Sequence, residues 1–321
     1  MTTEKSSWPG NMKGLWRDLF IKVAYRIRTH VWLFDLIRHV YVPPKNVYRK
    51  VIIKGAFPVR VTSHATFRIF NHGRAEDSAI ETDLFWAGLG NGWEGTSLLL
   101  WALLAKDAQC IHDIGANTGV YALTSKCINP KAAVVAFEPS EWVYERLVKN
   151  VKLNGPEFDI TTEMLAVSDR SGEAILYDSG AIDSASVQPR SGVGVWSFPV
   201  STIRLDEYCA GNCVPDLLKI DVEGHEQHVL YGLGELLAYV KPTMLIEILD
   251  EPTAHGVMRA IEGLDYRIFA IREGIGIERV SQPKRVARSD RNYLLCQAAL
   301  SRRHGLNEHT SHGQIMAALD R

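Results

Sequence analysis

The sequence lacks an excess of either charge, a long apolar run and a rich set of cysteines. Its 321 residues carry 36 basic and 37 acidic side chains, for a formal net charge of -1. Without a basic excess there is no field to attract a polyphosphate, which argues against nucleic acid as a partner. No uncharged apolar run approaches the roughly 18 residues of a membrane span, and the first residues do not follow a signal-peptide pattern. We therefore expect a cytoplasmic protein.

The five cysteines are odd in number and stand in apolar or scattered contexts: Cys110, Cys127, Cys209, Cys213 and Cys296. Cys209 and Cys213 form a C-x-x-x-C pair, but no second pair accompanies them, so a zinc site is only weakly indicated. Free cysteines behave as small buried hydrophobic residues. We expect free thiols in a reducing compartment and no bound metal.

Residues 1–48 are expected to form an N-terminal extension. After a polar, frayed start, residues 12–42 predict one or two basic amphipathic helices. The apolar positions recur every four residues at Leu15, Leu19, Val23, Ile27 and Val31. The favoured interpretation is a helix that packs on the body of the protein or on a second subunit. The alternative is a peripheral helix at the inner face of an anionic membrane.

Residues 49–107 predict a lead-in of strands and one helix. Short β-rich runs occur at 51–53, 59–61 and 66–70, followed by a glycine-rich loop at 86–93 and an apolar helix at 94–105.

The most informative stretch runs from Ile111 to Tyr121 and predicts a strand, a tight glycine loop and the start of a helix. Its pattern is D-x-G-x-x-x-G, with Asp113, Gly115 and Gly119. This spacing matches neither the dinucleotide fingerprint nor the phosphate-binding P-loop. An acid two positions before the first glycine suits a ligand with an ammonium group and hydroxyls, such as S-adenosylmethionine.

Acidic residues recur at the ends of the strands that follow. Glu138 ends the strand 132–137, about 20 residues after the glycine loop, where a carboxylate can bind a ribose diol. Lys219 and Asp221 share one face of the strand 216–221, and such a buried pair must either form an ion pair or serve chemistry. Glu247 lies near the end of the strand 243–248. The sequence thus predicts one sheet edge that carries four acids.

The other elements are predicted by periodicity alone. Helices are expected at 120–128, 141–153 and 226–237, and strands at 160–166, 173–177, 266–271 and 292–296. Residues 179–199 form a loop rich in glycine, serine and proline, which we interpret as part of an acceptor site or its lid. Residues 301–321 are expected to be a solvated polar tail.

These motifs resemble the FkbM family of S-adenosylmethionine-dependent methyltransferases. The resemblance spans about residues 90 to 300. It rests on D-I-G-A-N-T-G at 113–119, F-E-P at 137–139, A-V-S-D at 166–169 with Gly172, and L-K-I-D-V-E-G-H-E at 218–226. It implies a Rossmann-like α/β domain at 108–300, with helices on both faces of a seven-stranded, mostly parallel sheet whose last strand is antiparallel.

The resemblance also implies the roles of individual residues. The methionine part of the cofactor is assigned to the glycine loop: Asp113, Gly115, Ala116, Asn117, Thr118 and Gly119. Glu138 and Pro139 are assigned to the ribose, and Ser168 and Asp169 to the adenine edge. Asp221 is placed near the sulfonium and the acceptor.

The implied reaction is methyl transfer to a hydroxyl of a small molecule or glycan, such as a sugar, a polyketide or a lipid-linked saccharide. The candidate bases are Asp221, His225, Lys219 and Glu247. His225 has the most suitable unperturbed pKa, Lys219 could act if burial lowers its pKa, and Glu223 could instead cap the following helix. The alternatives are a methyltransferase for protein or RNA, a NAD-dependent oxidoreductase and a non-catalytic cofactor-binding protein.

Overall fold

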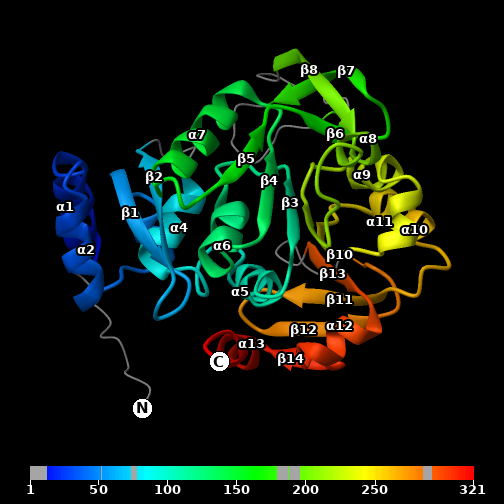
Figure 1. Ribbon diagram of the computed structural model, residues 1–321. Coiled ribbons are helices and arrows are strands. Elements are labelled where there is room, and N and C mark those ends of the chain that lie inside the picture. Colours follow the sequence, from blue (N-terminus) through cyan, green and yellow to red (C-terminus); the bar gives the residue numbers. More distant parts are fainter. Residues whose placement is uncertain (1–12, 52, 74–77, 179–186, 188–195, 285–290) are drawn as a thin grey trace.

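The computed structural model describes residues 13–51, 53–73, 78–178, 187, 196–284 and 291–321. A nine-stranded sheet forms its centre (Figure 1), in the order β14-β12-β11-β13-β10-β9-β3-β4-β5. These strands are β14 (His309–Ser311), β12 (Gly276–Val280), β11 (Arg267–Arg272), β13 (Asn292–Cys296), β10 (Thr243–Glu247), β9 (Leu217–Ile220), β3 (Cys110–Ile114), β4 (Ala133–Phe137) and β5 (Ile160–Glu163).

The predicted fold class is confirmed. Strands β5, β4, β3, β9 and β10 are parallel, and β13 enters antiparallel between β10 and β11. The sheet has nine strands rather than seven because β12 and β14 extend it beyond β11. Every residue of β3, β9 and β10 is buried, as expected for parallel strands covered on both faces.

Helices cover the two faces of this sheet. One face packs on α5 (Gly95–Ala105), α6 (Val120–Ile128), α7 (Glu141–Lys152) and α13 (His312–Leu319). The other packs on α8 (Leu205–Cys209), α9 (Glu226–Gly232), α10 (Glu235–Val240) and α11 (Glu251–Ala260). The strands alternate between the two layers, so that Ile111 faces the first and Ile114 the second. The single helix predicted at 226–237 is two helices in the structure, α9 and α10.

The N-terminal region consists of α1 (Lys13–Arg26), α2 (Val31–Val40), α3 (Lys45–Tyr48), the hairpin β1 (Lys54–Arg60) and β2 (Thr66–His72), and α4 (Ala79–Ala87). The prediction of two short strands at 51–53 and 59–61 was partly wrong: Val51 and Ile53 lie outside β1, whereas Val59 and Arg60 are its last two residues. The sequence also failed to predict α4, which contains Trp86 from the expected loop. Buried Asp83 fixes α4 through ion pairs of 2.8 Å to Arg49 and 3.1 Å to Lys45.

The prediction that residues 12–42 form helices packed on the protein body is confirmed. Phe34 is fully buried, and Phe20 and Ile27 pack against the same core. The predicted stripe is out of register, however, because Leu19 and Val23 are each 48% exposed. Both helices lie at the edge of the molecule beside β1 (Figure 1). Within the described part of the chain, no helix is long and apolar enough to cross a bilayer.

A second, three-stranded sheet contains β6 (Ala166–Ser168), β8 (Trp196–Arg204) and β7 (Gly172–Asp178) in that order. It begins where a single strand was predicted at 160–166, which the structure divides between β5 and β6. The loop predicted at 179–199 falls mostly on 179–186 and 188–195, outside the described residues. Its last four positions belong to β8, which the sequence did not predict.

The expectation of a solvated tail at 301–321 was wrong. This segment contains the end of α12 (Ala298–Arg303), then β14 and α13. Ile315 and Leu319 are buried in the core shared with α5, and Lys106 Nζ donates to the Leu319 carbonyl at 2.6 Å. A capping box formed by Ser311 and Gln314 starts α13, so the sequence did contain a signal for this helix.

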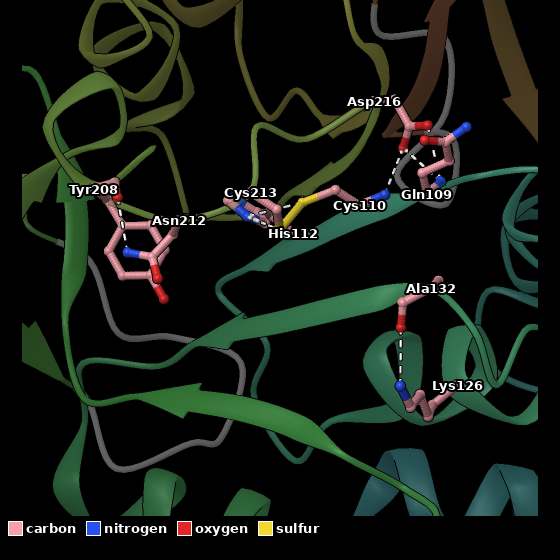
Figure 2. Close-up of a disulfide and its surroundings, with 9 residues drawn as sticks. All are labelled: Gln109, Cys110, His112, Lys126, Ala132, Tyr208, Asn212, Cys213 and Asp216. Carbon is pink, nitrogen blue, oxygen red and sulfur yellow. Dashed lines mark hydrogen bonds between the residues drawn. A yellow bond between two sulfur atoms is a disulfide. The ribbon is translucent and has the colours of Figure 1, made fainter. Parts of the chain in front are cut away.

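The expectation that all five cysteines are free was also wrong. A disulfide joins Cys110, at the start of β3, to Cys213, in the segment before β9 (Figure 2). The two residues are 103 positions apart in the chain and meet because β9 pairs with β3. Cys127, Cys209 and Cys296 are free, as predicted.

Candidate active site

A pocket opens at the carboxyl ends of the parallel strands, where open α/β sheets bind ligands. Strand pairing aligns Ile114 of β3 with Ile220 of β9, and Ile220 with Ile246 of β10, so the residues that follow these strands converge. Predicted site residues on its wall are Gly115, Ala116, Asn117, Thr118, Glu138, Pro139, Lys219, Asp221, His225 and Glu247. Asp113, Gly119, Ser168 and Asp169 are not among the lining residues.

The glycine loop is held against the neighbouring strand ends by its backbone. Gly115 adopts φ +77°, and a Cβ there would lie 1.8 Å from the carbonyl oxygen of Asp221. The amides of Gly115 and Ala116 both donate to the Phe137 carbonyl, at 3.0 and 2.9 Å. Gly115 is thus required by the close approach of β9, as well as by its positive φ.

Asp113 and Gly119 support the loop from behind. The Asp113 carboxylate accepts the Ala122 amide of α6 at 2.9 Å. Burial raises the pKa of Asp113 to about 7, and the nearby Lys219 ammonium limits that rise. Gly119 adopts φ +90° at the N-terminus of α6, where a Cβ would meet Leu147 at 2.6 Å. Both residues therefore shape the loop rather than line the pocket.

Glu138 presents its carboxylate at the end of β4. One oxygen accepts the Asn117 amide at 3.0 Å and the other accepts the Ser140 amide at 2.9 Å. These two bonds fix the orientation of the Glu138 side chain at the pocket wall.

A cluster of opposite charges occupies the pocket floor. Lys219, 1% exposed, donates to Asp221 at 2.9 Å, and Arg291 lies 3.3 Å from Glu247. Glu94, which the sequence did not predict, accepts the Tyr121 hydroxyl at 2.6 Å. A carboxylate oxygen from each of Glu94, Asp221 and Glu247 lies within 4.8 Å of the other two.

The members of this cluster differ in the protonation state that their surroundings favour. Burial alone would lower the pKa of Lys219, but Asp221, Glu94 and Glu247 raise it above its usual value, so Lys219 is held as an ammonium. Burial and repulsion from Asp221 and Glu223 raise the pKa of Glu247 well above its usual value. Burial also raises the pKa of Glu94. Lys219 is therefore poorly suited to accept a proton, whereas Glu247 and Glu94 are better suited than ordinary carboxylates.

His225 belongs to a separate group of polar side chains. Its Nε2 lies 2.9 Å from the Ser168 hydroxyl, and its ring stacks on His228, which lies 3.1 Å from Asp169. Burial, together with His228, lowers the pKa of His225 to about 4. Ser168 and Asp169 thus position the two imidazoles, and only His225 reaches the pocket wall.

Glu226 holds the loop after β9 through side-chain hydrogen bonds to its backbone. One Glu226 oxygen accepts the amides of Val222 and Gly224, at 3.2 and 3.1 Å. The N-cap position of α9 is His225, so the expectation that Glu223 caps this helix was wrong. Glu223 instead lines the pocket in a left-handed conformation, with φ 56°.

Other lining residues were not predicted from the sequence. Glu94 and Trp93 precede α5, Tyr121 lies on α6, and Arg291 immediately precedes β13. Tyr121 ends the glycine-loop stretch but was given no role there, and the other three lie outside the motifs and reach the pocket through tertiary packing. The described lining contains two basic groups, Lys219 and Arg291, and five carboxylates: Glu94, Glu138, Asp221, Glu223 and Glu247.

Comparison with known proteins agrees with this geometry. Residues 113–268 match the model of the methyltransferase FkbM domain. A hexuronic acid methyltransferase, AglP of Haloferax volcanii, is 33% identical over 147 residues, which are 45% of this chain and 57% of that protein. The 2-O-methyltransferase NoeI of Sinorhizobium fredii is 31% identical over 153 residues, which are 42% of this chain and 62% of that protein. The chain thus spans less than two thirds of either relative.

Among solved structures, the FkbM methyltransferase of Methylobacillus flagellatus aligns with a TM-score of 0.42 and 15% identity, over 59% of this chain and 44% of that one. The matched domain contains the glycine loop and the β9 segment with Lys219 and Asp221. Residues 113–268 of this chain thus match the FkbM domain of methyltransferases.

Proposed function

We propose that the protein transfers a methyl group from S-adenosylmethionine to a hydroxyl group of a sugar. The observation that carries this proposal is the charge of the pocket, whose described lining has five carboxylates and two basic groups beside a glycine loop. S-adenosylmethionine has a sulfonium, an ammonium and one carboxylate, for a net charge of +1. A cationic ligand therefore suits this pocket better than a dinucleotide pyrophosphate does.

The individual residues fit the parts of this cofactor. Glu138 lines the pocket at the end of β4, and a carboxylate there can accept hydrogen bonds from the ribose hydroxyls. Asn117 and the backbone of Gly115 lie on the wall where the methionine part would bind. Leu165, Val167 and Val143 offer an apolar surface for the adenine ring, with His225 at its edge. When bound, the cofactor supplies an electrophilic methyl group.

The protein must then orient the acceptor hydroxyl and receive its proton. Glu247 fits this role, because its Oε2 is buried with no hydrogen-bond partner among the described residues, while its Oε1 is held by Arg291. Burial and repulsion from Asp221 and Glu223 raise the pKa of Glu247, so it binds a proton more strongly than an ordinary carboxylate does. Asp221 and Lys219 neutralise each other and keep a fixed dipole beside the reacting atoms.

A sugar acceptor is supported by the relatives and by the pocket wall. The relatives are named as a hexuronic acid methyltransferase and a 2-O-methyltransferase. Trp93 offers an aromatic face, and Arg291 and Glu94 offer a donor and an acceptor for hydroxyl groups. A protein or RNA acceptor is the second candidate, but the near-neutral charge of the chain disfavours RNA.

Calorimetric titration tests the cofactor. We expect micromolar binding of S-adenosylmethionine, no binding of NAD, and affinity reduced by about tenfold or more in Glu138→Ala. Glu141→Gln, an exposed change on α7, is the matched control and should bind normally. Failure to bind either S-adenosylmethionine or its demethylated product would reject the proposal. Transfer of labelled methyl to hexoses, uronic acids and oligosaccharides, compared with protein and RNA, identifies the acceptor class.

We propose in addition that α1 and α2 contact an anionic membrane surface, which would bring the pocket near lipid-linked saccharides. Trp32, Leu36 and Val40 recur every four residues on α2 and are 64%, 58% and 90% exposed. Lys22 and Arg26 of α1 are also exposed. An aromatic and apolar stripe with basic neighbours suits a peripheral helix, and the basic residues favour a membrane over a second copy of the same surface.

A further inference from the structure

Three potential metal ligands meet near the start of β3, away from the glycine loop that follows this strand. Cys110 and His112 project from the same side of β3, two residues apart, and Cys213 approaches from the segment before β9 (Figure 2). His112 Nε2 lies 3.6 Å from Cys110 Sγ and 3.9 Å from Cys213 Sγ. None of the three lines the pocket, so the group is separate from the proposed active site.

The distances from the imidazole to the sulfurs match those of a zinc site. With Zn–S near 2.3 Å, Zn–N near 2.05 Å and tetrahedral angles, the nitrogen and each sulfur are about 3.6 Å apart and the two sulfurs about 3.8 Å apart. The two nitrogen–sulfur distances are therefore close to those of a tetrahedral site. Only the sulfurs, which are bonded to each other here, would have to separate.

The surroundings hold the imidazole in place and leave access for a metal. His112 is fully buried and packs edge-on against Phe137 and Tyr208, at ring distances of 5.6 and 5.9 Å. Its Nε2 faces the two sulfurs, and its Nδ1 is buried with no hydrogen-bond partner among the described residues. Cys213 is only partly buried, so this side of the group lies near the surface.

We propose that reduction of the disulfide creates a zinc site formed by Cys110, Cys213 and His112, with water as the fourth ligand. A dithiol reductant transfers two electrons and two protons to the disulfide, giving two thiols and the oxidised reductant. Zn²⁺ then replaces both thiol protons, which pass to solvent, and His112 donates a nitrogen lone pair. Two thiolates and an imidazole are a donor set that selects zinc over hard cations.

The oxidised protein and the reduced, zinc-bound protein would have the same two segments cross-linked. The disulfide joins the start of β3 to the segment before β9, and zinc would join them through the same sulfurs. Asp216 already ties this region by accepting the amides of Gln109 and Cys110, at 2.9 and 3.1 Å (Figure 2). The reduced, metal-free protein is the state in which the cross-link is lost.

Metal titration of the full chain tests the proposal. The reduced protein, freed of metal and excess reductant, is titrated with Co²⁺ and with Zn²⁺ in competition with a chromogenic chelator. We expect one equivalent of metal, the thiolate-to-cobalt charge-transfer band and the d–d bands of tetrahedral Co²⁺. The oxidised wild type should show neither, and Cys213→Ser should bind at least about 100-fold more weakly.

Cys127→Ser is the matched control, because Cys127 is a free cysteine on α6, and it should bind like the wild type. The proposal is rejected if the reduced wild type binds metal no better than the oxidised wild type or if cobalt shows no thiolate band. The comparison of the two wild-type states needs no substitution, so a folding defect in a variant cannot obscure the result. Methyl transfer is not the readout, so this test is independent of the proposed function.

Discussion

The backbones of Gly115 and Asp221 are in direct contact, because a Cβ on Gly115 would lie 1.8 Å from the Asp221 carbonyl oxygen. The Asp221 amide also donates to the Ile114 carbonyl at 3.0 Å, so the contact is fixed on both sides of the loop. The glycine loop and the carboxylate proposed to face the sulfonium therefore form one rigid unit. A change that separates them should affect cofactor binding and stability together.

Gly115→Ala is expected to separate these two segments. The new methyl group would meet backbone rather than a flexible side chain, at a φ of +77° that L-residues rarely adopt. We expect a loss of about 2 to 3 kcal/mol in the free energy of unfolding and at least tenfold weaker binding of S-adenosylmethionine. Urea unfolding and calorimetry measure the two effects.

Gly263→Ala is the control for the conformational part of this loss. Gly263 has a φ of +74°, and a Cβ added there would meet no atom within 4 Å, so only the backbone strain remains. The substitution should cost about 1 kcal/mol and leave cofactor binding unchanged. Equal losses in the two variants would show that the contact with Asp221 has no energetic effect.

Glu247→Gln tests the group proposed to accept the acceptor proton. The amide keeps the size of the side chain and cannot be protonated by the acceptor, so kcat should fall by about 10²- to 10⁴-fold while cofactor affinity changes little. In the wild type, kcat should rise with pH as Glu247 loses its proton, because its pKa is raised. The variant should lose that rise. Glu251→Gln, exposed on α11, is the control and should keep the wild-type profile.

The sequence predicted the part of the site that local patterns encode. Gly115, Glu138 and Asp221 each come directly after a strand, and Glu247 is the last residue of β10. Parallel strands bring their carboxyl ends to one edge of the sheet. Glu94 could not be predicted in this way, since it reaches the site through a hydrogen bond to Tyr121, 27 residues away.

Contacts between distant parts of the chain also explain the wrong predictions for the cysteines and for the C-terminal segment. Cys110 and Cys213 become neighbours only when β9 enters the sheet beside β3, which no local pattern reports. The C-terminal segment looked polar because Ile315 and Leu319 are few among hydrophilic neighbours, although both are buried against the apolar α5. Composition averaged over the segment hid this short amphipathic helix.

Glu226 makes stability depend on pH. Burial raises its folded-state pKa from 4.5 to about 7, so the folded protein retains a proton that the unfolded chain releases. This contribution is fully present below pH 4.5 and is lost as pH rises through about 7, amounting to about 3 kcal/mol. Glu226→Gln keeps an acceptor for Val222 and Gly224 and removes the titration. Chemical unfolding at several pH values should therefore show a smaller loss between pH 4.5 and 7.5 in the variant; parallel curves would contradict this role.

The exposed stripe on α2 predicts binding to anionic vesicles. Trp32 and Leu36 would insert among the lipid headgroups while nearby basic residues attract the surface, so binding should weaken with added salt. Replacing both Trp32 and Leu36 with serine should reduce co-sedimentation with phosphatidylglycerol vesicles by about tenfold, since two large apolar side chains no longer leave water. Tyr239→Ser removes a side chain that is 88% exposed on α10 and should have no effect. If the double variant instead abolishes a dimer seen by light scattering and the wild type ignores vesicles, the stripe is a contact between two copies of the chain.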